Sequence, residues 1–211
     1  MEPQFYKGNR DAFMEKLAPG SLALFFSGVP VRKTADEDYA YFANRNFVYL
    51  TGMEQKDTIL MLEKDACGYR ETLFILPPNL IEERWTGARM KPEEIEAASM
   101  ISNFAYRDTF EEELKKVLAS GRIEKVYLDI DRMDGQVVVS GADSMETFLK
   151  QEYPNLLIEN SLPILKKLRL IKKPCEIRAM EKAQEITKAG ILAMMTHSKP
   201  GMYEYQYKAE Y

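Results

Sequence analysis

The sequence predicts an α/β domain with a mixed β-sheet flanked by helices. Short apolar runs bounded by turn residues recur through the first two thirds of the 211-residue chain, and amphipathic segments of helical period lie between them. Hydrophobic residues make up 45% and charged residues 29% of the chain, which is typical of a globular protein with a buried core. Strands that alternate with helices in this way place the helices on the faces of a sheet.

Six apolar runs are expected to form strands: 22–27, 47–51, 58–63, 71–76, 125–130 and 156–159. The third and fourth runs are separated by a polar turn, so they are expected to pair as a hairpin. In 47–51 the alternate residues are apolar on both faces, as in a covered strand, and 44–46 is the polar turn before it. Helical patterns with first-turn and amphipathic signals lie at 11–17, 92–100, 110–118 and 144–152.

The pattern changes near residue 162, where a basic and apolar stretch ends in Lys-Lys-Pro and a long helix begins. We therefore expect a domain over 1–161, a linker over 162–173 and a further segment over 174–211. From Ala189 the long helix is apolar nearly all round, so its end needs burial on several sides. A new polar helix opens at Tyr203 and reaches Tyr211 without a C-cap signal. These features predict that the sequence stops inside a larger protein.

Composition excludes several classes of protein. A formal net charge of -4 lacks the basic excess that drives phosphate binding, so nucleic acid is not an expected partner. The start of the chain has no apolar segment of a secretion signal, and no apolar stretch approaches the length of a membrane span. The cysteines, Cys67 and Cys175, lie far apart in a chain that needs no disulfide, which favours a reducing cytoplasm.

Familiar catalytic and metal-binding motifs are missing from the sequence. His197 is the single histidine, which rules out zinc motifs built on several histidines, and the glycine spacings exclude nucleotide-binding loops and the hydrolase nucleophile elbow. The acidic stretch 129–135 lacks the glycine and glutamate positions of a calcium loop. We therefore expect no catalytic residue and no metal ligand set in this chain.

The stretch TADEDYAYFANRNFVYLTG at 34–52 resembles the N-terminal domain of aminopeptidase P, the Xaa-Pro aminopeptidase of the creatinase and prolidase group. Further matching stretches are PGS at 19–21, ERWTGAR at 83–89, LRLIKKPCEI at 168–177 and KPGMYE at 199–204. The resemblance covers essentially the whole chain.

The resemblance implies an N-terminal α/β domain, a linker and the opening helix of a larger "pita-bread" metallopeptidase domain. In the family, two divalent metal ions of the Mn²⁺ type are held by two aspartates, a histidine and two glutamates, which are expected beyond Tyr211. The complete enzyme would remove the N-terminal residue that precedes proline. This chain alone would bind no cofactor and would be inactive.

The resemblance also implies a homo-oligomer, a dimer or a tetramer, in which this domain helps to close the substrate cleft of a neighbouring subunit. By motif match, the substrate-cleft residues are Asp36 and Trp85. A carboxylate there would bind the free amine of a peptide or cleft arginines, and an indole would present an apolar wall to proline. The alternatives are a loop-capping aspartate and a half-buried core tryptophan. The aromatic stretch 39–49 is expected to be mainly core, with an interface as the alternative.

Two other functions remain open from the sequence. The same type of domain occurs in non-enzymatic proteins, including a histone chaperone subunit, where it binds peptides or partners without metal. Creatinase and prolidase are nearer alternatives, which differ from the aminopeptidase in substrate rather than in architecture, and the contexts of Asp36 and Trp85 favour the aminopeptidase.

Overall fold

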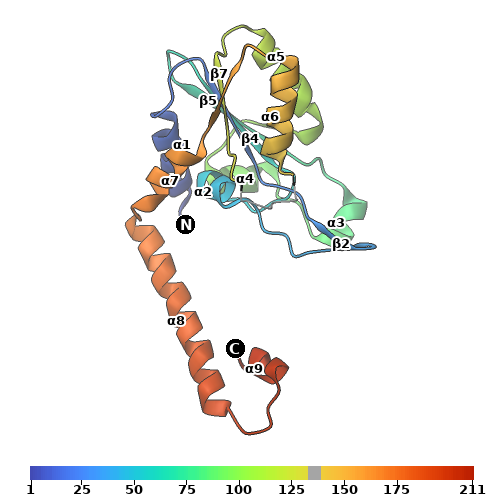
Figure 1. Ribbon diagram of the computed structural model, residues 1–211, viewed down its shortest axis with the longest axis vertical. Coiled ribbons are helices and arrows are strands. Elements are labelled where there is room, and N and C mark those ends of the chain that lie inside the picture. The colour runs from blue at the N-terminus through green and yellow to red at the C-terminus, as the bar shows by residue number, and fades with distance from the viewer. Residues whose placement is uncertain (133–138) are drawn as a thin grey trace. The chain divides into compact units, whose positions relative to one another are not determined.

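A six-stranded mixed sheet with the order β6-β5-β4-β1-β7-β8 lies at the centre of residues 2–169 (Figure 1). In this computed structural model, which describes residues 1–132 and 139–211, β4 runs antiparallel to its neighbours β1 and β5, and the other neighbouring strands are parallel. The strands are β1 (Ser21–Phe26), β4 (Ile59–Lys64), β5 (Tyr69–Ile75), β6 (Phe104–Tyr106), β7 (Lys125–Leu128) and β8 (Leu157–Asn160). The α/β class and the mixed sheet predicted from the sequence are confirmed.

Helices cover both faces of the sheet (Figure 1). One face is covered by α1 (Pro3–Met14), α2 (Arg45–Thr51), α4 (Pro92–Ser99) and α7 (Leu162–Leu170), and the other by α5 (Phe110–Ala119) and α6 (Gly141–Glu152). In β1, Ala23 and Phe25 pack into the first layer while Leu22 and Leu24 pack into the second. The strand is apolar throughout because both of its faces are covered.

The predicted elements and the structure agree at most positions. The runs predicted as strands, other than 47–51, overlap β1, β4, β5, β7 and β8, and β4 pairs with β5 as the predicted hairpin. The helices predicted at 92–100, 110–118 and 144–152 overlap α4, α5 and α6, and the helix predicted at 11–17 begins earlier, at Pro3. Proline is favoured in a first turn, where its missing N–H costs no hydrogen bond.

The prediction of a strand over 47–51 is wrong, because this run forms helix α2. The side chain of Asn44 accepts hydrogen bonds from the backbone N–H groups of Asn46, at 2.8 Å, and Phe47, at 3.0 Å, which caps the helix. Gly52 ends it with a φ of 75°. A short apolar run buried on both sides has no period that separates a strand from a helix.

Several elements were not predicted from the sequence. They are the hairpin of β2 (Arg32–Thr34) and β3 (Glu37–Asp38), the strand β6, the helix α3 (Leu80–Thr86), the 3₁₀ turn η1 (Arg107–Thr109) and the helix α7. The residues of β2, β3 and α3 are not buried, so these segments carry no hydrophobic period that could reveal them.

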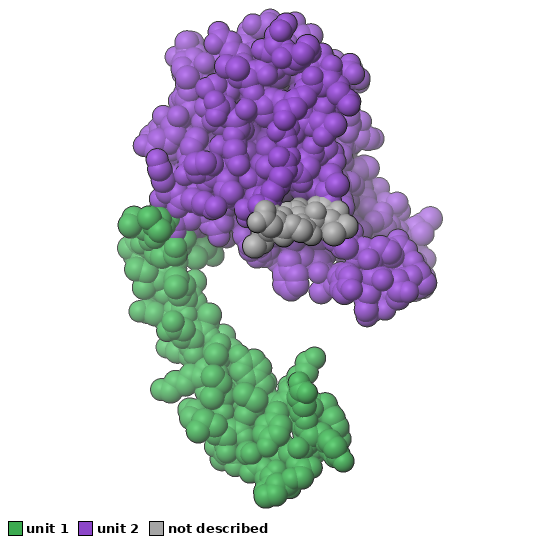
Figure 2. Space-filling model, in the orientation of Figure 1, with its two compact units in different colours: residues 1, 170–211 green, residues 2–169 purple. Residues whose placement is uncertain are grey.

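Residues 170–211 and Met1 form a second unit, shown in green in Figure 2. It contains α8 (Pro174–His197) and α9 (Glu204–Glu210). The ring of Tyr211 packs over Gly190, where a Cβ atom would lie 2.7 Å from the ring. No residue of α8 is buried, and Ile186, Leu192 and Met195 are exposed. No helix in the described part of the chain is both long and apolar enough to cross a membrane.

The segment expected as a linker, 162–173, contains α7, whose Leu165 is fully buried in the first core layer. The division between the two compact units falls after Arg169. The guanidinium of Arg169 donates to the side-chain oxygen of Asn46 at 2.5 Å and lies 5.6 Å from the ring centre of Tyr49, so the end of α7 is held against α2. The domain limits at 161 and 173 stay a prediction.

The fully buried side chain of Arg10 joins four elements. It donates to the carboxylate of Glu71 in β5 at 2.7 and 3.2 Å. It also donates to the carbonyl of Leu50 in α2 at 2.8 Å and to the carbonyl of Ser99 in α4 at 2.9 Å. These carbonyls lie in the last turns of their helices, where no intrahelical donor is available. Arg10 therefore fixes α1 to α2, α4 and the sheet.

Replacement of Gly52 by alanine tests the end of α2. The new Cβ would lie 2.4 Å from Cε2 of Tyr6, in a left-handed backbone conformation. Gly52→Ala should lower the free energy of unfolding by about 2–4 kcal/mol. Gly8→Ala in α1, where nothing lies within 4 Å, should raise it by about 0.5–1 kcal/mol. Urea unfolding followed by circular dichroism measures both, and equal stability of the two variants would contradict this account.

The Arg10 cluster predicts a second difference in stability. Arg10→Met leaves the largely buried Glu71 and two helix-end carbonyls without a donor, so the free energy of unfolding should fall by about 3–5 kcal/mol. The exposed pair of Lys33 and Glu37 provides the control, because Lys33→Met should cost less than about 1 kcal/mol. A loss for Arg10→Met as small as that of the control, in the same urea titration, would refute the central role of Arg10.

Candidate functional site

Asp36 lies at the tip of the β2–β3 hairpin, in a turn in which the preceding Ala35 has a φ of 41°. The hairpin is held by ion pairs between Arg32 and Asp38 at 2.9 Å and between Lys33 and Glu37 at 2.7 Å. The carboxylate of Asp36 is exposed and has no partner among the described residues. It is therefore free to bind a cation from outside the domain.

Trp85 lies on α3 with 88% of its surface exposed. The side chain of Asn79 caps this helix by accepting from the N–H groups of Ile81 and Glu82, both at 3.2 Å. Gly87 ends the helix with a φ of 90°. Because the indole is not buried, the expectation of a half-buried core tryptophan does not describe it.

The carboxylate of Glu82 ties α3 to its surroundings. It pairs with Lys56 at 3.1 Å and with Arg89 at 2.5 Å. The hydrogen bond from Lys56, with further help from Arg89, lowers the pKa of Glu82 below its ordinary value. The guanidinium of Arg89 also donates to the carbonyl of Pro77. Arg89 therefore joins the end of the segment 77–89 to its beginning, and Lys56 holds α3 to the loop before β4.

The hairpin and α3 border one pocket of about 490 Å³. We name it the Tyr41 pocket. Its walls come from the arm of the hairpin, the loop before β4 and the segment that follows α3, and they include Tyr39, Tyr41, Gln55, Arg89 and Met90. Neither Asp36 nor Trp85 lines the pocket, although each lies on an element beside it.

Two polar groups of the Tyr41 pocket have particular environments. The hydroxyl of Tyr41 donates to the carbonyl of Ser27 at 3.0 Å, and burial raises the pKa of this phenol. The side-chain amide of Gln55 is buried, and neither its nitrogen nor its oxygen has a hydrogen-bond partner in the described part of the chain. A buried unpaired amide is costly, so its presence identifies a polar position that a bound molecule or water can satisfy.

Large apolar side chains are exposed on the two segments that border the Tyr41 pocket. We name this set the outer apolar surface, which consists of Val29, Val31, Tyr39, Phe42, Leu80, Ile81 and Trp85. Phe42 and Trp85 are 80% and 88% exposed. Within the aromatic stretch 39–49, Phe47 and Tyr49 are buried in the core as predicted, but Tyr39 and Phe42 are not. Large exposed apolar side chains on neighbouring segments are a feature of protein interfaces.

The motif match predicts Asp36 and Trp85 as site residues, but no sequence pattern predicts that Tyr41, Gln55 or Lys56 lines a pocket. Arg89 closes the matching stretch 83–89, so the motif contained a signal for it. Gln55 stands in a polar loop, and no local pattern distinguishes it from an exposed glutamine. Its position in the pocket wall depends on the packing of the hairpin against the loop.

Asp129, the first residue of the acidic stretch 129–135, is engaged in contacts within the domain. Asp129 is buried and accepts two hydrogen bonds from the amide nitrogen of Asn46, at 2.9 and 3.0 Å, and burial raises its pKa. Asp134 and Gly135 lie outside the described residues. Among residues 1–132 and 139–211, no group of three or more potential ligands could hold a metal ion. By the resemblance, the ligands of the two-metal centre of the complete enzyme are expected beyond Tyr211.

Comparisons with known proteins agree with this architecture. The family model "Aminopeptidase P, N-terminal domain" matches residues 6–127. The Xaa-Pro aminopeptidase of Escherichia coli K12 is 28% identical over 98% of this chain and 47% of its own length. A Bacillus anthracis structure assigned as an aminopeptidase P matches 100% of this chain and 50% of its own with a TM-score of 0.94 and 30% identity. The E. coli aminopeptidase P structure with the inhibitor Pro-Leu has a TM-score of 0.83 at 27% identity, over 100% of this chain and 48% of its own.

The fold and the site define a three-layer α/β domain whose candidate functional residues lie on an exposed hairpin and helix. The family model covers more than half of the chain, and the chain belongs to the aminopeptidase P N-terminal domain family. It spans about half the length of the curated relatives and solved structures that it matches.

Loss of the Glu82 carboxylate tests how α3 is held. Glu82→Gln removes the ion pairs with Lys56 and Arg89, so the segment around Trp85 should open more often. Trypsin cleavage after Arg84, measured by mass spectrometry, should become roughly twofold to fivefold faster. Glu93→Gln, at an exposed position in α4, is the matched control and should leave this rate unchanged. An unchanged rate for Glu82→Gln would show that other contacts hold α3.

Proposed function

We propose that this chain is the N-terminal, non-catalytic part of a metal-dependent Xaa-Pro aminopeptidase, which removes the N-terminal residue that precedes proline. The observation that carries the proposal is the match of residues 6–127 to the family model, together with a fold shared over the whole chain with an aminopeptidase P. The relatives that cover most of this chain carry the name Xaa-Pro aminopeptidase, which favours this activity over those of creatinase and prolidase.

The proposed complete enzyme holds two divalent metal ions, with Mn²⁺ as the expected metal, in its catalytic domain. A structure of the E. coli relative is described as zinc-substituted and in complex with product, which supports a divalent metal centre in the family. Such a pair of ions would polarise the scissile carbonyl and supply hydroxide. The part played by this chain would be to bind and orient the substrate and to exclude water.

Asp36 and Trp85 are the proposed substrate-cleft residues, acting on a neighbouring subunit in a dimer or tetramer. Their exposure supports this role, because neither side chain is used by the fold of its own domain. Asp36 would attract the free amine of the peptide, and the indole would cover its proline. The outer apolar surface supports an interface between subunits at this position.

A cytoplasmic location is also part of the proposal. Cys67 and Cys175 are both free, which suits a reducing compartment. The peptide substrate with proline in the second position is the expected partner, and neither nucleic acid nor a membrane is.

The activity is tested with the complete reading frame and with the 211-residue chain. The complete protein should release arginine from Arg-Pro-Pro in the presence of Mn²⁺ and should lose this activity in a chelator, while residues 1–211 alone should release none. If the complete protein binds peptides but does not cleave them with any divalent metal, the chain belongs to a binding module. Cleavage by residues 1–211 alone would overturn the accessory role.

The role of Trp85 is tested separately in the complete enzyme. Trp85→Ala should lower kcat/KM for Arg-Pro-Pro by about 10- to 30-fold, because it removes a large exposed contact surface. Metal content and circular dichroism should not change. Leu157→Ala on the edge strand β8 is the control, since Leu157 is also exposed but lies outside the site. Unchanged kinetics for Trp85→Ala would remove this residue from the cleft.

A further inference from the structure

A second cavity, of about 470 Å³, lies between the sheet and the helices α5 and α6. We name it the α5–α6 cavity. It shares no lining residue with the Tyr41 pocket, and it opens beside the carboxyl end of β1, next to the start of β4. Its volume lies within the range of small-molecule sites, and open α/β sheets bind ligands at the carboxyl ends of their strands. The volume and position suit a small molecule.

The floor of the α5–α6 cavity is apolar and aromatic. It includes Phe26, Phe110, Leu114, Met145 and Phe148. The rings of Phe26 and Phe110 meet edge to face with their centres 6.3 Å apart. Phe26, Met145 and Phe148 are only partly buried, so they offer apolar surface to an occupant. This floor would favour the aliphatic or aromatic side chain of a ligand.

The rim of the cavity carries charges of both signs. The guanidinium of Arg107 donates to the carboxylate of Asp57 at 3.1 Å and to that of Glu111 at 2.9 Å, which leaves one negative charge in excess. Lys115 lies one helical turn after Glu111 on α5, is exposed and has no carboxylate partner among the described residues. Among the residues that the structure describes, the rim therefore carries one excess negative charge and an ammonium group that pairs with no carboxylate.

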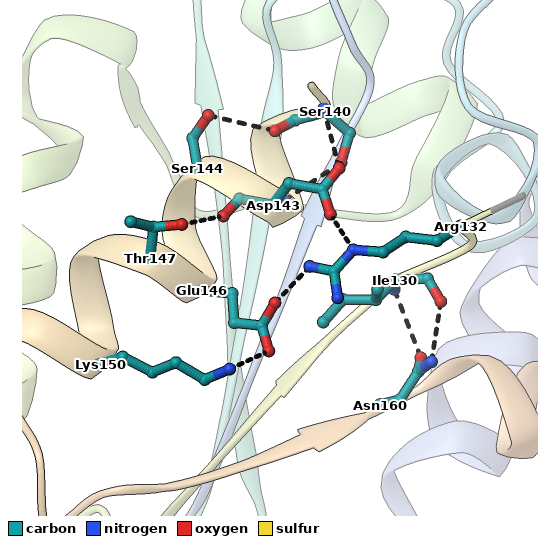
Figure 3. A network of polar contacts seen from close by, with 9 residues as sticks. All are labelled: Ile130, Arg132, Ser140, Asp143, Ser144, Glu146, Thr147, Lys150 and Asn160. Carbon is teal, nitrogen blue, oxygen red and sulfur yellow. Dashed lines mark hydrogen bonds and ion pairs between the residues drawn. The ribbon is translucent and has the colours of Figure 1, made fainter. Parts of the chain in front are cut away.

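The wall made by α6 is already held by its own contacts (Figure 3). The side chain of Ser140 caps the helix by accepting from the N–H of Asp143 at 3.1 Å. Arg132 pairs with Asp143 at 2.7 Å and with Glu146, and Lys150 pairs with Glu146 at 2.8 Å. Because these charges and the helix N-terminus are engaged, the wall offers no site for a bare anion. These contacts do, however, fix α6 in place as a wall of the cavity.

We propose that the α5–α6 cavity binds a small zwitterion with an apolar side chain, which is the chemistry of a free α-amino acid such as leucine. The ammonium group lies at Asp57 and Glu111, the carboxylate lies at Lys115, and the side chain packs on the aromatic floor. A short apolar peptide carries the same three features. The inference does not depend on the proposed peptidase activity, because it rests on binding by this chain alone.

Binding of defined ligands to the 211-residue chain, measured by nuclear magnetic resonance titration, tests the proposal. L-leucine should bind saturably, with shifts in residues of α5 and α6. N-acetyl-leucine lacks the ammonium and leucinamide lacks the carboxylate, so each should bind about tenfold more weakly. Tighter binding of leucyl-leucine than of leucine would identify a peptide as the ligand, and weaker binding would identify the free amino acid. The absence of saturable binding, or equal affinity for leucine and its two blocked forms, would overturn the proposal.

A pair of variants locates the site. Lys115→Met removes the free ammonium from the rim and should weaken leucine binding about tenfold. Lys116→Met is the matched control, because Lys116 is an exposed neighbour that pairs with Glu112 and Glu113 and does not line the cavity. Both lysines are exposed, so both variants should keep the circular dichroism spectrum of the parent. Unchanged affinity in Lys115→Met would exclude the carboxylate contact and with it the proposed site.

Discussion

The hydrogen bonds of the buried Arg10 guanidinium hold α1, α2 and α4 to each other and to the sheet. A buried charge is tolerated only when its hydrogen bonds are satisfied, and Arg10 donates to a carboxylate and to two helix-end carbonyls. The groups that it needs come from α2, α4 and β5, so these elements must meet at one point. Asn9 adds a similar contact by donating to the carbonyl of Tyr49 at 2.8 Å. Adjacent polar residues of α1 thereby replace the missing donors at the end of α2.

This rigid layer contrasts with the candidate site. The hairpin that carries Asp36 and the helix that carries Trp85 contribute no buried residue, and charged pairs such as that of Glu82 with Arg89 hold them. The ion pairs of the hairpin are exposed and contribute little to stability, so the hairpin adds less to the stability of the domain than the contacts of Arg10 do. The short elements that follow β1 and β5 in the chain carry the exposed candidate residues. This arrangement suits the proposed role of the domain on a neighbouring subunit.

The two faces of the sheet differ in how completely the helices that cover them fill the layer. On one face the buried Arg10 cluster and the helices that it joins fill the layer, while on the other α5 and α6 leave a cavity with an aromatic floor. The charges that border this cavity are unevenly satisfied. Arg107 is shared by two carboxylates, and Lys115 is paired with none among the described residues. The polar contacts of α6 show the opposite case, since Lys150 of the helix and Arg132 from outside it both pair with acidic side chains of α6.

The sequence by itself determined the α/β class and most of the sheet strands, because apolar period is recorded in neighbouring residues, and its local motifs predicted Asp36 and Trp85 as candidate residues. Only the tertiary structure decided that 47–51 is a helix, since capping by Asn44 and burial on both sides outweigh the strand-like pattern. It also decided that α7 packs into the core and that Tyr41 and Gln55 share a pocket with Arg89. The positions of α7 and of the pocket residues depend on contacts between residues far apart in the chain, which no local pattern records, whereas the Asn44 cap is a local contact.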